Sequence, residues 1–451
     1  MELWTFGFNG HAQLEAQLST ATCPGTSRLS SLSSSSSPSS PSSPSSSSSS
    51  SSEKEDYIYA PKLVLQGHSI QVLWSSWCDA LVLIQPTPHS QPCPYTIYAG
   101  TGVLPTTISD LKPIIHATVN ESEHLHFFGA PLGPGLQGVL KASTSVIGLL
   151  NPIRPRLPPE INTSSAERFV LGYAAVIPSN PEYIHGPRED GDPHNLFIKH
   201  ISVTSGGHVS AVAINKSKEF AIESSVVGWP SVAGFEKWLD NGDIIEFAGK
   251  SMPIPNVANL VSNATSTTAL STAAQVYTWT SDPRYPTCLG RLADADAPAS
   301  HPHPVPYLSE TNIVSIASGG YLTAALSADG ELFVWGQACP GTTSSLSVLR
   351  QDDDGDEWVK CVELEIDGQE ARVTHVAIGF GHVIVAAEAI GRGHVERAVF
   401  AAGQGESGQL GVGKSPTFIQ DFRQVEALRG KKIKELRAAG WSSWVVVEVQ
   451  E

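Results

Sequence analysis

The feature that most constrains the fold is a repeat that returns every 56 to 60 residues in the second half of the chain. Its clearest copy is residues 313–336, IVSIASGGYLTAALSADGELFVWG, in which Gly-Gly and Asp-Gly separate alternating apolar runs. Such alternation predicts strands with one buried face, and Asp-Gly between two runs predicts a hairpin. Self-similarity at this period indicates an array of similar supersecondary units.

The units can be counted from copies of the first run. Copies begin at Ile201, Val257, Ile313, Val373 and Ile433, and another begins at Ile70. The 131 residues between Ile70 and Ile201 leave room for one more unit. Seven units are therefore predicted, starting near residues 70, 136, 201, 257, 313, 373 and 433, with boundaries between 85 and 195 left open.

A Ser/Pro-rich tract interrupts the pattern near the start of the chain. Residues 30–56 consist mostly of serine and proline and end in a short charged run. Such a tract has almost nothing to bury, so it cannot offset the entropy of folding. It is predicted to be a disordered insertion within a blade, and a phosphorylatable regulatory segment is the alternative.

The two chain ends complement each other. The unit at Ile433 breaks off after its second strand, whereas residues 3–7, LWTFG, repeat the third run LFVWG. Pairing the first strand with the last would close the array and protect its edges. The prediction is one all-β domain over residues 1–451, a seven-bladed β-propeller closed by pairing of the N-terminal strand with the C-terminal blade.

These same segments carry a family resemblance. SGGYLTAALSADGELFVWG, AAGQGESGQLGVG and LWTFGFNGHAQL resemble repeats of the regulator-of-chromosome-condensation family, which implies a seven-bladed β-propeller. The resemblance covers nearly the whole chain and is weakest between residues 85 and 195. The N-terminal layout is most similar to the small single-domain relatives, and it lacks the basic tail of the founding exchange factor.

Composition narrows the function classes. Forty-four acidic and 28 basic residues give a net charge of −16, which opposes broad binding to a phosphate backbone. No signal peptide and no membrane span is visible, so the protein is expected in the cytoplasm, the nucleus or both. The six cysteines are scattered without a C-x-x-C, which favours free thiols over a zinc site or disulfides.

Two glycine-rich motifs overlap near the end of the chain. Residues 408–415 match the phosphate-loop pattern G-x-x-x-x-G-K-[ST], and residues 403–408 match G-x-G-x-x-G. Both chemistries require a helix directly behind the loop, but Pro416 and the residues after it favour an extended segment. The glycines are interpreted as repeat turns, and nucleotide hydrolysis at Lys414 is kept as an alternative hypothesis.

The candidate partner-contact residues lie in two loops, and the divergent region 85–195 is a third candidate contact region. The first is an acidic run, Asp352, Asp353, Asp354, Asp356 and Glu357, and the second is the Pro-rich segment 297–306 with His301 and His303. A calcium loop does not fit the acidic run, because Arg350 and Cys361 would occupy the first and last ligand positions. Both loops are therefore interpreted as solvated connectors that a partner can contact.

Other side chains receive a structural interpretation. His208 and His382 occupy equivalent repeat positions, which predicts a hydrogen bond within each blade rather than metal ligation. Four tryptophans, Trp74, Trp77, Trp441 and Trp444, lie in two WSSW motifs and are interpreted as packing residues or as an anchor for a partner. The basic cluster at residues 429–437 is interpreted as a solvated connector, with nucleic-acid contact or nuclear import as alternatives.

The most consistent function is non-enzymatic. Repeated strands supply stability and leave the loops free to vary, which suits a scaffold that binds other proteins. A small GTPase or a chromatin-associated protein is a candidate partner, and no direct nucleic-acid ligand, cofactor, metal or catalytic residue is predicted. The alternative that the resemblance implies is a guanine-nucleotide exchange factor for a Ran-like small GTPase.

Overall fold

The computed structural model describes the larger part of the chain. The described residues are 1–15, 56–86, 95–100, 125–129, 137–141, 146–149, 170–171, 174–178, 196–215, 224–241, 252–350, 358–391, 393–414 and 417–449. The predicted Ser/Pro insertion, apart from its last residue, and the acidic run of residues 352–357 lie outside the described residues.

The described strands form seven sheets of three to five strands and one separate hairpin. In spatial order, the first four sheets are β3 (Ser69–Ser75), β4 (Asp79–Gln85) and β5 (Tyr95–Gly100); β6 (Leu125–Gly129), β7 (Gln137–Lys141), β8 (Val146–Leu149), β10 (Ala174–Pro178) and β9 (Val170–Leu171); β11 (Leu196–Val203), β12 (Val209–Asn215), β13 (Ser224–Trp229) and β14 (Met252–Ile254); and β15 (Val257–Ser262), β16 (Ser266–Ser271), β17 (Val276–Thr280) and β18 (His303–Pro304).

The remaining sheets follow the same plan. They are β19 (Ile313–Gly319), β20 (Leu322–Ser327), β21 (Leu332–Gly336) and β22 (Lys360–Val362); β25 (Arg372–Ile378), β26 (His382–Gly391), β27 (His394–Gln404) and β28 (Phe418–Gln424); and β2 (Tyr57–Gln66), β1 (Glu2–Phe8), β30 (Ser442–Glu448) and β29 (Lys432–Ala439). The hairpin is β23 (Glu365–Ile366) with β24 (Gln369–Glu370).

Helical segments are short and lie between strands. The α-helix α2 (Val232–Asn241) lies between β13 and β14 along the chain. The 3₁₀ turns are η3 (Pro286–Leu289), η4 (Pro306–Leu308), η5 (Ser347–Leu349) and η6 (Glu426–Leu428). The protein is therefore an all-β structure, as the alternating apolar runs predicted.

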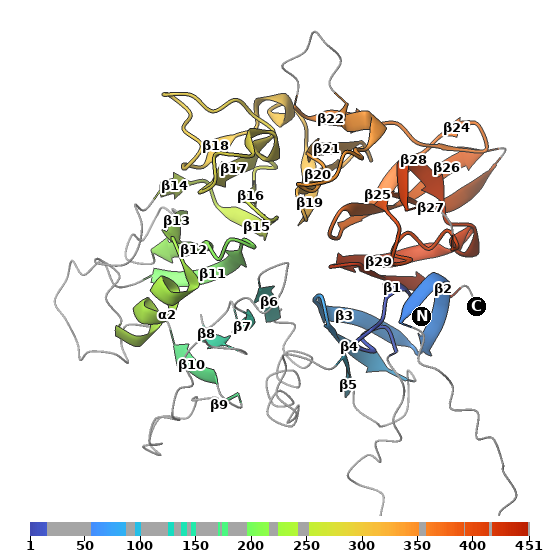
Figure 1. Cartoon of the computed structure of the whole chain (residues 1–451), viewed down its shortest axis with the longest axis horizontal. Helices are drawn as coiled ribbons and strands as arrows, with labels where there is room; N and C mark the ends of the chain where they lie inside the picture. Colours follow the sequence, from blue (N-terminus) through green and yellow to red (C-terminus); the bar gives the residue numbers. More distant parts are fainter. Residues whose placement is uncertain are drawn as a thin grey trace, which may run out of the picture.

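The sheets are arranged around a common centre (Figure 1). Neighbouring strands within each sheet are antiparallel, and most sheets, such as β19-β20-β21-β22, are β-meanders. In the sheet that begins with β6, β10 lies between β8 and β9. The first strands contact one another in order: β3 with β6, β6 with β11, β11 with β15, β15 with β19, β19 with β25, β25 with β29, and β29 with β3. This arrangement of repeated meanders is that of a β-propeller.

The N-terminal strand completes the sheet of the last unit. In the β1–β30 pair Trp4 lies opposite Val445, and Leu3 lies opposite Val446. On its other edge β1 pairs with β2, with Leu3 opposite Leu65. The strand from the start of the chain is therefore an interior strand of a sheet that the end of the chain also builds, as the complementary chain ends predicted.

The core lies between neighbouring sheets. All six residues of β20 are buried, and so are all six of β16, because each of these second strands is covered on both faces. One buried cluster joins Leu270 of β16 to Ile313 and Trp335 of the next sheet. Small residues on the second strands let adjacent sheets approach closely, so the sheets pack as wedges.

One glycine recurs at the end of the third strand. Gly336 has φ +122°, and a Cβ there would lie 2.1 Å from the carbonyl oxygen of Tyr321. Any side chain would therefore collide with the turn that joins the first two strands. Equivalent clashes would arise at Gly7, Gly100 and Gly403, which explains why the runs LWTFG, LFVWG and VFAAG all end in glycine.

Candidate binding face around the central cavity

The turns between first and second strands adjoin one another. We call the surface that they form the turn face; its described turns are residues 76–78, 204–208, 263–265, 320–321, 379–381 and 440–441. The amide of Ala264 donates to the carbonyl of Gly320, and the amide of Phe380 donates to that of Gly440, both at 2.7 Å. Because main-chain hydrogen bonds connect neighbouring sheets here, the turn face is a rigid surface.

A cavity of about 260 Å³ lies where the first strands meet. Its described walls come from β3, β6, β11, β15, β19, β25 and β29 and from turns of the turn face, including Gly320 and Gly440. Serine hydroxyls supply polar groups: the Ser202 hydroxyl donates to Ser262 Oγ at 2.6 Å. We call this space the central cavity.

Among the described residues that line the central cavity, Arg437 alone has an ionisable side chain. Its Nε donates to Glu435 Oε1 at 2.7 Å, and the side chain of Arg437 is 50% exposed. The second carboxylate oxygen of Glu435 accepts the amide N–H of Val72 at 3.1 Å. Glu435 thus joins two sheets and orients the guanidinium at the cavity wall.

Half-buried aromatic side chains gather beside the cavity. We define the aromatic cluster as Phe8, Trp77, Phe380 and Trp441. The ring centroids of Trp77 and Trp441 are 4.3 Å apart, and Trp441 lies 6.2 Å from Phe8 and 6.5 Å from Phe380. Phe380 also lines the central cavity, so the aromatic cluster and the cavity share a border.

The two WSSW motifs divide their tryptophans between surface and core. Trp77 and Trp441 belong to the aromatic cluster, whereas Trp74 is 8% and Trp444 is 1% exposed. The packing role is therefore confirmed for Trp74 and Trp444, and the anchor role stays a prediction for the other two. The motif begins in a strand in one case and in a turn in the other. The sequence could not separate them, since register decides which tryptophan points inward.

The loop between β17 and β18 is held by a buried arginine. Arg291 is 4% exposed, and no carboxylate among the described residues pairs with it. Its guanidinium instead donates to main-chain carbonyls, those of Thr278, Leu292, Ala297, Pro298 and His301, at 2.8 to 3.2 Å. One cation thereby fixes the fold of a long loop, a role that no local sequence pattern indicated.

The predicted histidines lie in this same loop. The Oγ of Ser300 is 3.0 Å from His301 Nδ1, and the His301 carbonyl accepts a hydrogen bond from Arg291. His303 lies in β18 opposite Thr278, and burial lowers its pKa. His301 and His303 therefore lie on the loop that Arg291 holds, and the predicted acidic run of residues 352–357 lies outside the described residues.

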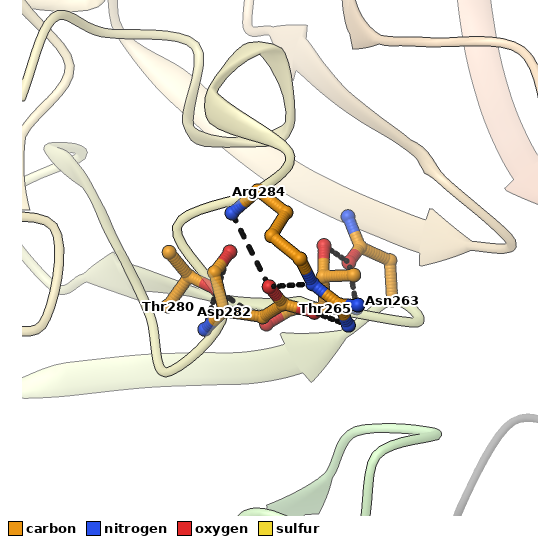
Figure 2. A network of polar contacts seen from close by, with 5 residues as sticks. All are labelled: Asn263, Thr265, Thr280, Asp282 and Arg284. Carbon is orange, nitrogen blue, oxygen red and sulfur yellow. Dashed lines mark hydrogen bonds and ion pairs between the residues drawn. The ribbon is translucent and has the colours of Figure 1, made fainter. Parts of the chain in front are cut away.

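The start of this loop is joined to the turn face by polar contacts (Figure 2). The Thr280 hydroxyl donates to the carbonyl of Thr265 at 2.6 Å. The carboxylate of Asp282 accepts both Nε and Nη2 of Arg284, at 2.8 and 2.6 Å, and this pair lowers the pKa of Asp282. Asn263 Oδ1 closes the turn by accepting the amide of Thr265 at 2.9 Å.

His382 is completely buried at the start of β26. Its Nε2 lies 3.1 Å from Ser443 Oγ, which belongs to β30 in the neighbouring sheet. The predicted hydrogen bond within the blade is therefore wrong for His382: the side chain spans two sheets, because strand starts of adjacent meanders lie side by side. Its burial lowers the pKa of His382 to about 4.

This burial predicts a pH-dependent stability. The unfolded chain protonates His382 near the ordinary histidine pKa of 6.5, whereas the folded chain protonates it only near pH 4. Above about pH 6.5 the titration of His382 therefore costs the folded state nothing. As the pH drops toward 4, this group lowers the free energy of unfolding by about 3 kcal/mol.

The measurement is urea unfolding at pH 7 and pH 4.5 for the natural chain and for His382→Gln. We expect the loss of stability on acidification to be smaller by about 2 kcal/mol in the variant. His394→Gln, which changes an exposed histidine, is the control. An equal loss in His382→Gln and the natural chain would contradict this role.

The glycine-rich motifs are turns rather than nucleotide loops. Gly408 has φ +82°, and a Cβ there would lie 2.6 Å from the carbonyl oxygen of Ile58. Lys414 Nζ lies 5.8 Å from the centroid of the Tyr59 ring. The described residues that follow form strand β28 and not the helix that phosphate binding requires.

The basic cluster at residues 429–437 is largely neutralised by acidic partners. Arg429 pairs with Asp367 at 2.6 Å and Lys432 pairs with Glu448 at 3.0 Å. Lys431 lies 4.6 Å from the Trp4 ring centroid and 3.6 Å from the Glu2 carboxylate. These contacts favour the predicted connector over a nucleic-acid surface, which would keep its cations free for phosphates.

Three further observations concern cysteines, metal ligands and membrane-spanning helices. Cys78, Cys288, Cys339 and Cys361, the cysteines within the described residues, are free thiols, as predicted. No group of three or more His, Cys, Asp or Glu side chains in the described ranges is arranged to hold a metal ion. None of the helices described by the structure has the length and hydropathy of a membrane-spanning segment.

Comparison with known proteins gave one curated relative and several similar folds. No family model matches the chain. The chain is 28% identical over 200 residues to the RCC1 domain-containing protein RUG3, mitochondrial, of Arabidopsis thaliana. That match covers 43% of this chain and 40% of the relative, so the chain spans less than half of the relative's length.

Among solved structures, the similarity extends over the whole chain. Prp20p from Saccharomyces cerevisiae, which has been studied for its binding to Gsp1p and histones, matches with a TM-score of 0.51 and 11% identity, covering 100% of this chain and 92% of Prp20p. Yeast RCC1 (Prp20) bound to Kap60 gives the same TM-score and identity, with 89% of that chain covered. At this identity the similarity concerns the fold.

Proposed function

We propose, from the premise that this chain is an RCC1-like β-propeller, that it is a non-enzymatic scaffold which binds partner proteins through its turn face. The observation that carries the proposal is the aromatic cluster, four large half-buried rings on a rigid surface. Aromatic side chains held rigidly lose little entropy on binding and dominate the energetics of protein interfaces.

The architecture that we propose is a single closed ring of seven blades. The succession of contacts between first strands, from β3 round to β29 and back to β3, supports a ring. The pairing of β1 with β30 supports its closure by the N-terminal strand. Closure would leave no open sheet edge at the ends of the array, which suits a stable platform.

The loops predicted from the sequence remain part of the proposal. We propose the segment of residues 297–306, with His301 and His303, and the acidic run of residues 352–357 as additional contact loops. Arg291 supports the first of these, because a loop fixed before binding loses less entropy when a partner docks. A small GTPase or a chromatin-associated protein is the candidate partner.

Removal of two tryptophans should abolish partner capture. We expect the tagged double variant Trp77→Ala/Trp441→Ala to capture about tenfold less of each specific partner, or still less. The reason is that paired aromatic anchors each contribute about 2 kcal/mol to binding. Capture from cell extract followed by quantitative mass spectrometry measures the change.

The matched control for this capture experiment is Ile390→Ala. Ile390 is 84% exposed and lies near the β26–β27 hairpin, at the end of β26 that is remote from the turn face. Full retention of specific partners by the double tryptophan variant, with thermal unfolding unchanged, would contradict a binding role for the aromatic cluster.

The exchange-factor alternative gives a distinct result. The full chain at catalytic amounts is expected to leave the rate of GDP release from a Ran-like GTPase unchanged. A fluorescent-nucleotide release assay, with an active exchange factor as positive control, measures this rate. Acceleration by the full chain would replace the scaffold proposal with the exchange-factor function.

The cellular location stays a prediction. We propose the cytoplasm, the nucleus or both, whereas the name of the Arabidopsis relative places that protein in mitochondria. Fluorescence microscopy of the full chain, tagged after its last residue, distinguishes these compartments.

A further inference from the structure

We infer that the central cavity receives a carboxylate side chain of a partner protein, while an apolar residue next to that carboxylate packs on the aromatic cluster. This inference rests on the proposed scaffold function and specifies what the turn face recognises. Its three supports are the charge of the cavity, the free donors of Arg437 and the border that cavity and aromatic cluster share.

The charge of the cavity selects an anion. Arg437 is the sole ionisable group among the described lining residues, and the other polar groups there are hydroxyls such as those of Ser202 and Ser318. The Ser318 hydroxyl is paired with Thr323 Oγ1 at 2.6 Å, and that of Ser202 with Ser262. With these serines already paired, the guanidinium is the natural site for an incoming acceptor.

Arg437 retains unused donors at the wall of the central cavity. Among the described residues, its guanidinium makes a hydrogen bond through Nε alone, to Glu435. Both carboxylate oxygens of Glu435 are engaged, since the other one accepts the amide of Val72. The two Nη groups are therefore available as a planar fork, which is the geometry that matches a carboxylate in a bidentate pair.

A carboxylate fits this site better than a phosphate. Phosphorylated motifs carry about two negative charges and are recognised by clusters of arginines. Here one cation stands beside its own acidic partner, Glu435, so a single negative charge suits the site better than two. A cavity of about 260 Å³ also accommodates an Asp or Glu side chain with its water.

The aromatic cluster supplies the second half of the recognition. Phe380 lines the cavity and lies 6.5 Å from Trp441, which packs on Trp77 at 4.3 Å. A segment whose carboxylate enters the cavity therefore places its neighbouring residue over half-buried rings. An acidic residue adjacent to an aliphatic or aromatic residue satisfies both surfaces, whereas a small free carboxylate satisfies only the first.

The test is a peptide selection on the intact chain. Phage-displayed random peptides are selected on the immobilised full chain, and enriched peptides are then measured by calorimetry. We expect enrichment of Asp or Glu next to an apolar residue. Replacing that Asp by Asn, or Glu by Gln, in the peptide should weaken binding by about tenfold or more.

The protein variants isolate Arg437. Arg437→Gln should weaken the same peptides by about tenfold or more, and Arg437→Lys should weaken them less, because Lys keeps the charge and loses the fork. Lys432→Gln, which changes a cation of the same strand that does not line the cavity, should have no effect. Thermal unfolding of each variant checks that the fold is intact.

Three outcomes would overturn the inference. They are a selection that enriches no acidic motif, an Arg437→Gln variant that binds the enriched peptides as tightly as the natural chain does, and competition by free glutarate as strong as that by the peptides. In each case, capture of partners that still depends on Trp77 and Trp441 would leave the scaffold function standing. Loss of that dependence would instead remove the scaffold function itself.

Discussion

Replacing Phe6 by alanine is expected to lower the free energy of unfolding of the whole protein by about 3–5 kcal/mol. Phe6 is 0% exposed and lies in β1, between β2 and β30. It belongs to the buried cluster that also contains Trp444, so the substitution leaves a cavity between segments from both ends of the chain. Urea unfolding followed by tryptophan fluorescence measures the change.

The control for this prediction is Val314→Ala. Val314 is 54% exposed in β19, and its truncation should change the free energy of unfolding by no more than about 0.5 kcal/mol. A loss below about 1 kcal/mol for Phe6→Ala would mean that β1 is not part of the cooperative core. A second, separate unfolding transition would mean that the sheet containing β1 folds independently of the others.

Replacing Arg291 by methionine is expected to lower the free energy of unfolding by about 3 kcal/mol or more. The substitution removes a buried cation that donates to five main-chain carbonyls and leaves those acceptors without the donor that they share. We also expect faster amide hydrogen exchange across residues 292–303, since the loop can recover its hydrogen bonds only by opening to water.

Two variants separate the network from the charge. Arg291→Lys keeps the charge but has fewer donors. Its free energy of unfolding should lie between that of the natural chain and that of Arg291→Met. Arg284→Met removes a bidentate but 76% exposed arginine, whose solvent-screened ion pair should contribute far less to stability than Arg291 does. If Arg291→Met unfolds like the natural chain and exchange is unchanged, the loop is held by packing rather than by Arg291.

The repeats allowed much of the fold to be predicted. Strand and turn positions in the second half followed from alternation and from glycines that sterics require, such as Gly336. Residues 7–14, GFNGHAQL, align with residues 403–410, GQGESGQL, and the two segments make the same contact. His11 donates its amide to Gln13 Oε1 at 3.1 Å, and Ser407 donates its amide to Gln409 Oε1 at 2.9 Å. Local geometry repeats here because local sequence repeats.

The candidate binding face was harder to predict, because its residues come from different repeats. Trp77 and Trp441 are 364 positions apart in sequence, and only the packing of neighbouring sheets places their rings in contact. Arg437 looked like one member of a basic connector until the structure placed it on the wall of a cavity. Arg291 gave no signal, since main-chain carbonyls, which are independent of side-chain identity, are its partners.

The pairing of β1 with β30 has a consequence for biosynthesis. Trp4 leaves the ribosome 441 residues before its neighbour Val445, so the β1–β30 pair can form only after the chain between them has been made. Until then β1 and the apolar side chains that it buries have an unfilled edge, which is the kind of surface that chaperones retain and that aggregation exploits. Completion of this sheet is thus expected to be a late step in folding, because β1 stays unpaired on that edge until β30 has been synthesised.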